Sequence, residues 1–146
     1  MLRSQISTKA TLVVVVLAAS VGCQNNHEGI VPVSGTVTID GKPLTVGQVR
    51  ILAKDHRPAM GRIQPDGSFT MSCFELSDGA PMGTHLATVS AVESINERSN
   101  RWHAPKKYAN KVSSDLWVTI DGPTEDLRIE LTWAGCKESG TFVDKF

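Results

Sequence analysis

Cysteine carries the most distinctive chemistry in this chain, and Cys23 holds the most informative of the three cysteine positions. Arg3 and Lys9 give the chain a positive start, and an uncharged run rich in valine and leucine follows over Ala10–Ala19. Small or short side chains at positions 20–22 stand directly before the cysteine. A positive start, an apolar run and small residues at the cut are the parts of an export signal. Cleavage there would leave the thiol of Cys23 on the first residue of the mature chain.

This junction resembles the lipobox of bacterial lipoproteins, in which the cysteine thiol is alkylated with diacylglycerol and the cysteine becomes an acylated N-terminus. The resemblance implies fatty acids such as palmitate on Cys23. Ser20 stands where a lipobox usually has leucine, so an ordinary cleaved signal and an uncleaved anchor remain alternatives. The apolar stretch from Ala10 to Cys23 is shorter than the roughly 20 residues that a spanning helix needs.

A lipidated Cys23 would make a membrane the first partner of the protein and the cell envelope its location. Gln24 follows the cysteine, in place of the aspartate that retains some lipoproteins in the inner membrane. The outer membrane or the periplasmic face is therefore favoured. Removal of residues 1–22 takes two positive charges from a total of 15 basic and 15 acidic residues. The nearly neutral remainder has no long-range field for nucleic acid, so no nucleic-acid partner is expected.

Cys73 and Cys136 remain, and an exported protein can keep them as one disulfide or as two thiols. Cys73 follows Phe69 and Met71 on one face of an alternating segment, which predicts a buried thiol. Cys136 stands beyond the last predicted strand among glycines, which predicts an exposed side chain. A bridge between these two positions would require the tail to fold over the domain, so we predict two free thiols.

The segment 93–114 shows no clear periodicity and gathers positive charge beside aromatic rings. Aromatic faces stack on sugar rings and accept cations, and arginine and lysine bind carboxylates or phosphates. An envelope protein or an anionic envelope polysaccharide would suit such a surface. The alternative is that the two aromatic residues pin the segment to the domain while the charges stay solvated. The candidate ligand-binding residues are Arg98, Arg101, Trp102, Lys106, Lys107 and Tyr108, and His103 and Lys111 lie among them.

The sequence contains no motif typical of a metal site, a calcium loop or a catalytic nucleophile. The four histidines are far apart, the Asp-Gly pairs lie outside any calcium-loop run, and no Gly-x-Ser-x-Gly elbow occurs. We therefore expect no metal site, no cofactor and no enzymatic activity. A small hydrolase whose site assembles only in the fold is a third, less favoured reading.

Period-2 alternation of apolar and polar residues runs through most of the chain after residue 30. Asp-Gly pairs that favour tight turns separate several of the alternating segments. Short strands with frequent turn signals predict an all-β sandwich or barrel. The seven predicted strands are Val31–Ile39, Val49–Ala53, Met60–Ile63, Phe69–Cys73, His85–Val92, Leu116–Ile120 and Leu127–Trp133.

The stretches Val31–Leu44 and Gln64–Thr70 resemble the opening and the recurring Asp-Gly hairpin of bacterial carboxypeptidase regulatory-like domains. Ala104–Asn110 is similar to a segment of small lipoproteins from planctomycete-type bacteria. The resemblance implies a seven-stranded Greek-key β-sandwich of the transthyretin (prealbumin) type after an N-terminal signal helix. The resemblance says little about function, because most such lipoproteins are uncharacterised. Enzyme relatives of this fold have motifs that this chain lacks.

The expected organisation is a lipoprotein signal peptide over 1–22, a polar tether over 23–30, a carboxypeptidase regulatory-like β-sandwich over 31–133 and a flexible C-terminal tail over 134–146. The expected function is that of a non-enzymatic lipoprotein of the cell envelope with a structural or protein-interaction module. The alternative is a carbohydrate-binding module that uses the 93–114 loop.

Overall fold

The computed structural model describes residues 27–145, and within them the fold is all-β, as the sequence predicts. The predicted signal peptide with its helix, and the lipidation residue Cys23, lie outside the described residues. No helix in the described part of the chain is long and apolar enough to cross a membrane. The only helix there is a single 3-10 turn, η1 (Lys106–Ala109).

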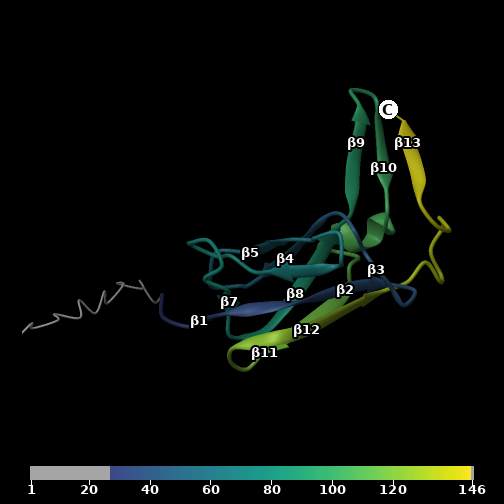
Figure 1. The fold of residues 1–146 in the computed structure, drawn as a ribbon. Helices are drawn as coiled ribbons and strands as arrows, with labels where there is room; N and C mark the ends of the chain where they lie inside the picture. The colour runs from purple at the N-terminus through teal and green to yellow at the C-terminus, as the bar shows by residue number, and fades with distance from the viewer. Residues whose placement is uncertain (1–26, 146) are drawn as a thin grey trace, which may run out of the picture.

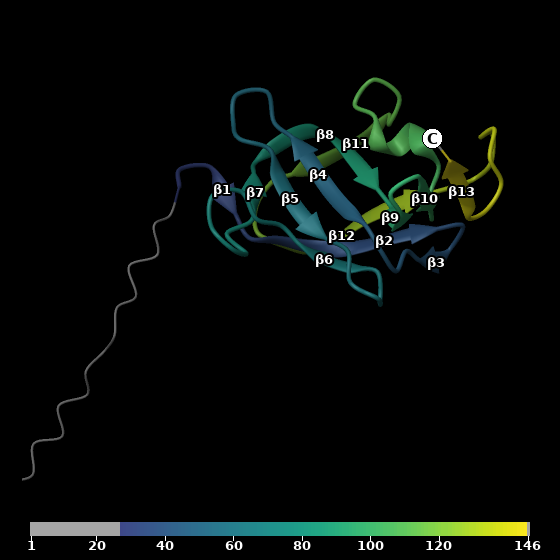
Figure 2. The same cartoon turned by 90° about the horizontal axis from the view of Figure 1, so that it is seen from above.

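Two sheets form the body of the molecule, which we call the sandwich (Figures 1 and 2). The first sheet has β2 (Val33–Ile39) at its centre, flanked by β12 (Thr124–Leu131) on one edge and by β6 (Ser68–Thr70) and β3 (Lys42–Pro43) on the other. The second sheet has the order β11 (Leu116–Ile120), β8 (Gly83–Ser90), β4 (Gln48–Leu52) and β5 (Ala59–Arg62). A short pair, β1 (Ile30–Val31) with β7 (Ala80–Pro81), lies at the N-terminal end.

Alternating apolar side chains from both sheets meet in one core. Val37 of β2, Ile51 of β4 and Phe69 of β6 are almost fully buried, as are Met71 and Ile120. In β12 the burial alternates as predicted, because Ile129 and Leu131 are buried while Arg128 is exposed. The seven predicted strands correspond, with shifted ends, to β2, β4, β5, β6, β8, β11 and β12.

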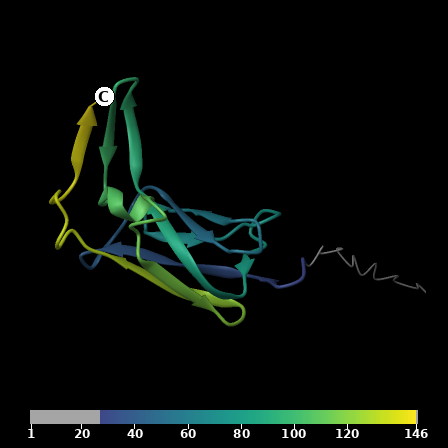
Figure 3. The same cartoon turned by 180° about the vertical axis from the view of Figure 1, so that it is seen from behind.

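The segment 93–114 and the C-terminal tail differ from the prediction, because both contain strands. β9 (Val92–Asn96) and β10 (Ser99–Trp102) form a hairpin inside the predicted loop, and β13 (Phe142–Lys145) pairs with β10. These three strands form a separate sheet, here called the arm, that stands away from the sandwich at the end opposite β1 (Figures 1 and 3). The sequence of these strands shows no clear alternation of apolar and polar residues, because the arm buries little surface on either of its faces.

The two described cysteines, Cys73 and Cys136, are not joined to each other in the structure. Cys73 is buried, and its thiol donates to the carbonyl oxygen of Arg57 at 3.3 Å. Burial raises the pKa of this thiol, and the carboxylate of Asp78 raises it further. Cys136 is half-buried rather than exposed, because its sulfur lies 3.6 Å from the carbonyl oxygen of Thr132.

Asp78 organises the connection between β6 and β7, here called the Asp78 loop (residues 72–79). Its carboxylate accepts backbone N–H hydrogen bonds from Cys73 at 2.6 Å, Phe74 at 2.9 Å and Glu75 at 3.0 Å. The N–H of Ser77 donates to the hydroxyl of Ser72 at the same time. Burial raises the pKa of Asp78, but the three N–H donors outweigh it and the pKa is lowered overall.

Truncation inside β12 should separate the buried face from the exposed face. Ile129→Ala should lower the free energy of unfolding by about 2–5 kcal/mol, because it removes buried methyl groups and leaves a cavity. Arg128→Ala, one position away on the exposed face, is the matched control and should leave the melting midpoint nearly unchanged. Equal losses in thermal unfolding of the two variants would contradict this register.

Asp78→Asn should lower stability at neutral pH and lose its effect in acid. The folded pKa of Asp78 is depressed, so its contribution is complete above the unfolded value of about 3.9 and disappears as the pH falls through the folded pKa. At pH 7 we expect a loss of about 1 kcal/mol in urea unfolding, because the carboxylate is partly solvated. An equal deficit at pH 7 and at pH 2.5 would show that charge is not the cause.

Candidate functional site

The arm carries three of the six predicted ligand-binding residues, Arg98, Arg101 and Trp102, and its first strand continues directly from the sandwich. The other three, Lys106, Lys107 and Tyr108, lie on η1. β8 ends at Ser90, the fully buried Ala91 follows, and β9 begins at Val92, so a nearly continuous strand runs from one sheet into the other. The N–H of His103 donates to the carbonyl oxygen of Ala91 at 2.8 Å and closes the base of the hairpin. The candidate residues are therefore held on paired strands and on η1.

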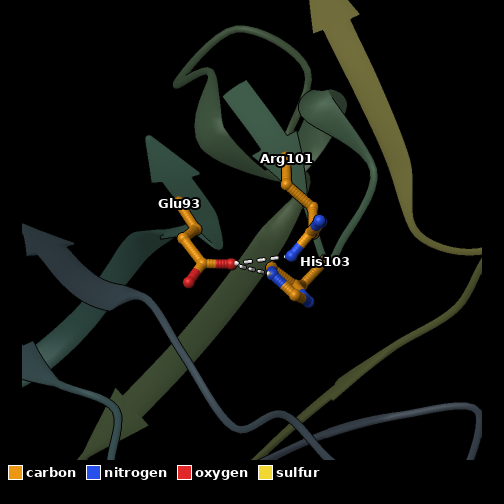
Figure 4. A network of polar contacts seen from close by, with 3 residues as sticks. All are labelled: Glu93, Arg101 and His103. Carbon is orange, nitrogen blue, oxygen red and sulfur yellow. Dashed lines mark hydrogen bonds and ion pairs between the residues drawn. The ribbon is translucent and has the colours of Figure 1, made fainter. Parts of the chain in front are cut away.

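Glu93 connects two of the basic residues on the arm (Figure 4). One carboxylate oxygen of Glu93 lies 3.5 Å from the guanidinium of Arg101 and 3.3 Å from Nε2 of His103. Both ion-pair partners are about half exposed, so the pair between Glu93 and Arg101 contributes at most about 1 kcal/mol. The positive charge of Arg101 is thus already partnered within the arm.

Trp102, Phe142 and Trp133 form an aromatic cluster where the arm meets the C-terminal segment. The rings of Trp102 and Phe142 stack with centroids 6.5 Å apart, and Trp133 meets Phe142 edge-on at 6.3 Å. The ammonium of Lys106 lies over Trp102 and Phe142, and it also forms an ion pair with Asp144. A cation above aromatic faces is attracted by their quadrupoles, so Lys106 joins η1 to β10 and β13 of the arm.

The indole N–H of Trp102 is buried and finds no hydrogen-bond partner among the described residues. A buried donor without a partner loses its hydration and gains nothing in return. Trp102 therefore has one polar atom that the rest of the arm leaves unsatisfied.

Tyr108 belongs to the core rather than to an open surface. The residue is 5% exposed, and its hydroxyl donates to the carbonyl oxygen of Thr132 at 3.3 Å and accepts from the N–H of the same residue at 3.2 Å. The ammonium of Lys107 lies 4.7 Å from the ring centroid. Burial lowers the pKa of Lys107, but Tyr108 and the thiol of Cys136 outweigh it, so the pKa is raised.

Arg98 and Lys111 lie apart from this cluster. Arg98 is exposed in the turn between β9 and β10, where its N–H donates to the side-chain oxygen of Asn96 at 2.9 Å. Lys111 is exposed in the segment after η1. Of the residues predicted from the sequence, the structure thus brings Lys106 of η1 into contact with Trp102 of β10, while Arg101 of β10 is paired with Glu93.

A cleft of about 340 Å³ opens where the sandwich meets the arm, and sequence reasoning did not find it. Its lining mixes polar, aromatic and aliphatic residues: Ile39, Asp40, Lys42, Pro43, Leu44, Thr45, His103, Trp133 and Thr141. The carboxylate of Asp40 joins the turn after β2 to the segment after β12, because it accepts from the hydroxyl of Thr132 at 2.6 Å and from the N–H of Trp133 at 3.4 Å. Asp40 precedes a glycine, which gave only a turn signal, and no spacing in the sequence connects it with Trp133.

The described residues contain no group of three histidine, cysteine, aspartate or glutamate side chains placed to hold a metal ion. The histidines have other neighbours: Nε2 of His85 lies 3.1 Å from the carbonyl oxygen of Pro81 and 3.0 Å from that of Met82, and the ring of His27 stacks on Phe74. The arm and the cleft at its base are therefore the candidate functional surfaces of the described chain.

Comparison with known proteins adds no family to this description: no protein-family model, no curated protein and no solved structure matches the chain. The functional argument therefore rests on the sequence and geometry of this molecule.

Proposed function

We propose that this chain is a non-enzymatic lipoprotein of the cell envelope, anchored through acylated Cys23, and that the arm is its protein-interaction module. The observation that carries the proposal is the arm itself, a three-stranded sheet held away from the core on the side opposite β1 (Figure 1). A module presented at the end remote from its anchor is accessible to partners in the envelope.

One face of the arm supports a protein partner. Val143 and Arg101 are cross-strand neighbours, as are Arg101 and Glu93, so these three side chains share a face. Ile95 is the residue of β9 that the ladder leaves unpaired at a β-bulge, so the strand alternation does not place it on this face. Ile95 is 44% exposed and Val143 is 47% exposed, so the arm presents two exposed apolar side chains in addition to its ion pair. Apolar side chains edged by charge are the usual composition of a protein-binding patch.

The sandwich would be of the transthyretin-like Greek-key type that the resemblance to carboxypeptidase regulatory-like domains implies. Two observations support this assignment. The core is shared between two sheets, and the turns at Asp40-Gly41 and Asp66-Gly67 lie where the resemblance expects them. Within this fold the arm would be an addition formed by the β9–β10 hairpin and β13.

The second candidate function is carbohydrate binding, and the cleft at the base of the arm favours it. The indole of Trp133 offers a stacking face, and the carboxylate of Asp40 with the ammonium of Lys42 offers polar groups for hydroxyls. This site differs from the predicted one, because Tyr108 is buried in the core and Arg101 and Lys106 already have acidic partners. A neutral or weakly charged envelope sugar would suit the cleft better than a strongly anionic one.

The anchor is tested by the mass of the mature protein. The membrane fraction should contain a chain that begins at Cys23 and carries fatty-acyl mass, and Cys23→Ser should abolish that species. A mature chain with an unmodified first residue, or one that keeps residues 1–22, would contradict the lipoprotein proposal.

Three surface variants of the membrane-bound protein distinguish the two candidate functions, one on the arm and two in the cleft. Val143→Asp should abolish photo-cross-linking from position 95 to an envelope protein and leave retention on isolated envelope polysaccharide unchanged, since it places a charge on the apolar patch. Lys42→Ala and Trp133→Ala should abolish retention on the polysaccharide and leave cross-linking from position 95 unchanged. Arg128, exposed on β12, is the control position for the cross-linker. Equal cross-linking from positions 95 and 128 would contradict the proposal that the arm binds a protein.

A further inference from the structure

Large apolar side chains are exposed at the N-terminal end of the sandwich, opposite the arm. Leu76 in the Asp78 loop is 92% exposed, Phe74 in the same loop is 43% exposed, and Met82, between β7 and β8, is 47% exposed. We call these three residues the apolar tip. Leucine exposed to this extent loses nearly all of the stabilisation that burial would give it. The apolar tip therefore has an unfavourable contact with water that a partner surface would remove.

The start of the described chain is fixed beside the apolar tip. The ring of His27 stacks on that of Phe74, with centroids 4.1 Å apart and planes inclined by 27°. The N–H of Met82 donates to the carbonyl oxygen of Gly29 at 2.9 Å. The chain therefore enters the sandwich between two members of the apolar tip, and Figure 2 shows the entry next to β1 and β7.

Hydrogen bonds within the Asp78 loop fix the backbone that carries its exposed apolar residues. The carboxylate of Asp78 binds the N–H groups of Cys73, Phe74 and Glu75, so the backbone that carries Phe74 is fixed. Ser77 has a φ of 62°, an uncommon conformation for a residue other than glycine, and its N–H is held by Ser72. A preorganised loop needs little further ordering when it meets a partner, so Leu76 can insert at small entropic cost.

Covalent geometry brings this end close to any anchor at Cys23. Four peptide steps separate Cys23 from His27, and such a segment spans at most about 14 Å when fully extended. The polar layer on one side of a bilayer is roughly 5–8 Å thick, so His27 lies at most about 6–9 Å beyond that layer when the tether is fully extended, and within the layer when it is not. From these observations we infer that the apolar tip inserts into the membrane interface, an inference that rests on the proposed lipid anchor.

Apolar insertion, rather than charge, would make this contact. The neighbouring loop between β4 and β5 bears Lys54 and Arg57 but also Asp55, and Glu28 is exposed beside the entry of the chain. Basic and acidic groups therefore alternate at this end, and no polybasic cluster faces the lipid. The contact should consequently persist at high salt, which screens charges but not apolar burial.

Fluorescence quenching in vesicles tests this contact on the full lipidated chain. An environment-sensitive fluorescent amino acid replaces Leu76, or as a matched control Val112, which is 86% exposed in the segment after η1. The vesicles contain phosphatidylethanolamine, phosphatidylglycerol and brominated lipid. Emission from position 76 should be quenched several-fold more than emission from position 112, in low and in high salt alike. Leu76→Ser should reduce the quenching of a probe at position 82 without changing the melting midpoint.

The outcomes distinguish this inference from the proposal on which it rests. A chain that carries acyl mass and floats with the vesicles, but is quenched equally at positions 76 and 112, would overturn membrane contact and leave the anchor intact. Quenching that disappears in high salt would overturn apolar insertion. A chain without acyl mass that does not float would overturn the anchor and this inference together.

Discussion

The hydrogen bonding of β2 on both edges is the constraint on which the rest of the structure depends. β12 pairs with it in parallel on one side, and β6 and β3 pair with it in antiparallel fashion on the other. The parallel contact is close at Gly35, where a Cβ atom would stand 1.9 Å from the carbonyl oxygen of Leu127. Glycine is therefore required there, and the pairing joins the beginning of the domain to its end. Because β2 also supplies Val33 and Val37 to the core, the register of this sheet decides what the second sheet can pack against.

The arm shows how a sheet with little buried surface can still hold a defined shape. Its ion pairs are exposed and individually weak. Its coherence comes instead from the strand ladder and from the stacked rings of Trp102 and Phe142, which lie directly opposite each other in the register of β10 and β13. Such cross-strand aromatic pairs stabilise sheets beyond their backbone hydrogen bonds.

Sequence reasoning found the sandwich strands because each of them has one buried face. Apolar Ile129 alternates with polar Arg128, and Phe69 with its polar neighbours, because Ile129 and Phe69 point into the core. The arm could not be found in the same way, since Trp102 meets a ring forty residues later in the chain. The basic neighbours of Tyr108 suggested a binding surface, but the alternative prediction, in which Tyr108 pins the segment to the domain, fits its buried ring and the hydrogen bond of its hydroxyl to Thr132. The cleft was missed for a related reason, because Asp40 and Trp133 become neighbours only through the parallel pairing of β2 with β12.

The buried Ala91, at which β8 passes into β9, has a mechanical consequence. β8 is hydrogen-bonded to β4 on one edge and to β11 on the other, and it runs from the end where the chain enters to the end where the arm stands. A pull between the two ends would act along the length of β8. Its hydrogen bonds would then bear the load together, in shear, instead of opening one after another as in an unzipping hairpin. The sandwich is thus arranged as a stiff link that can transmit tension between its two ends.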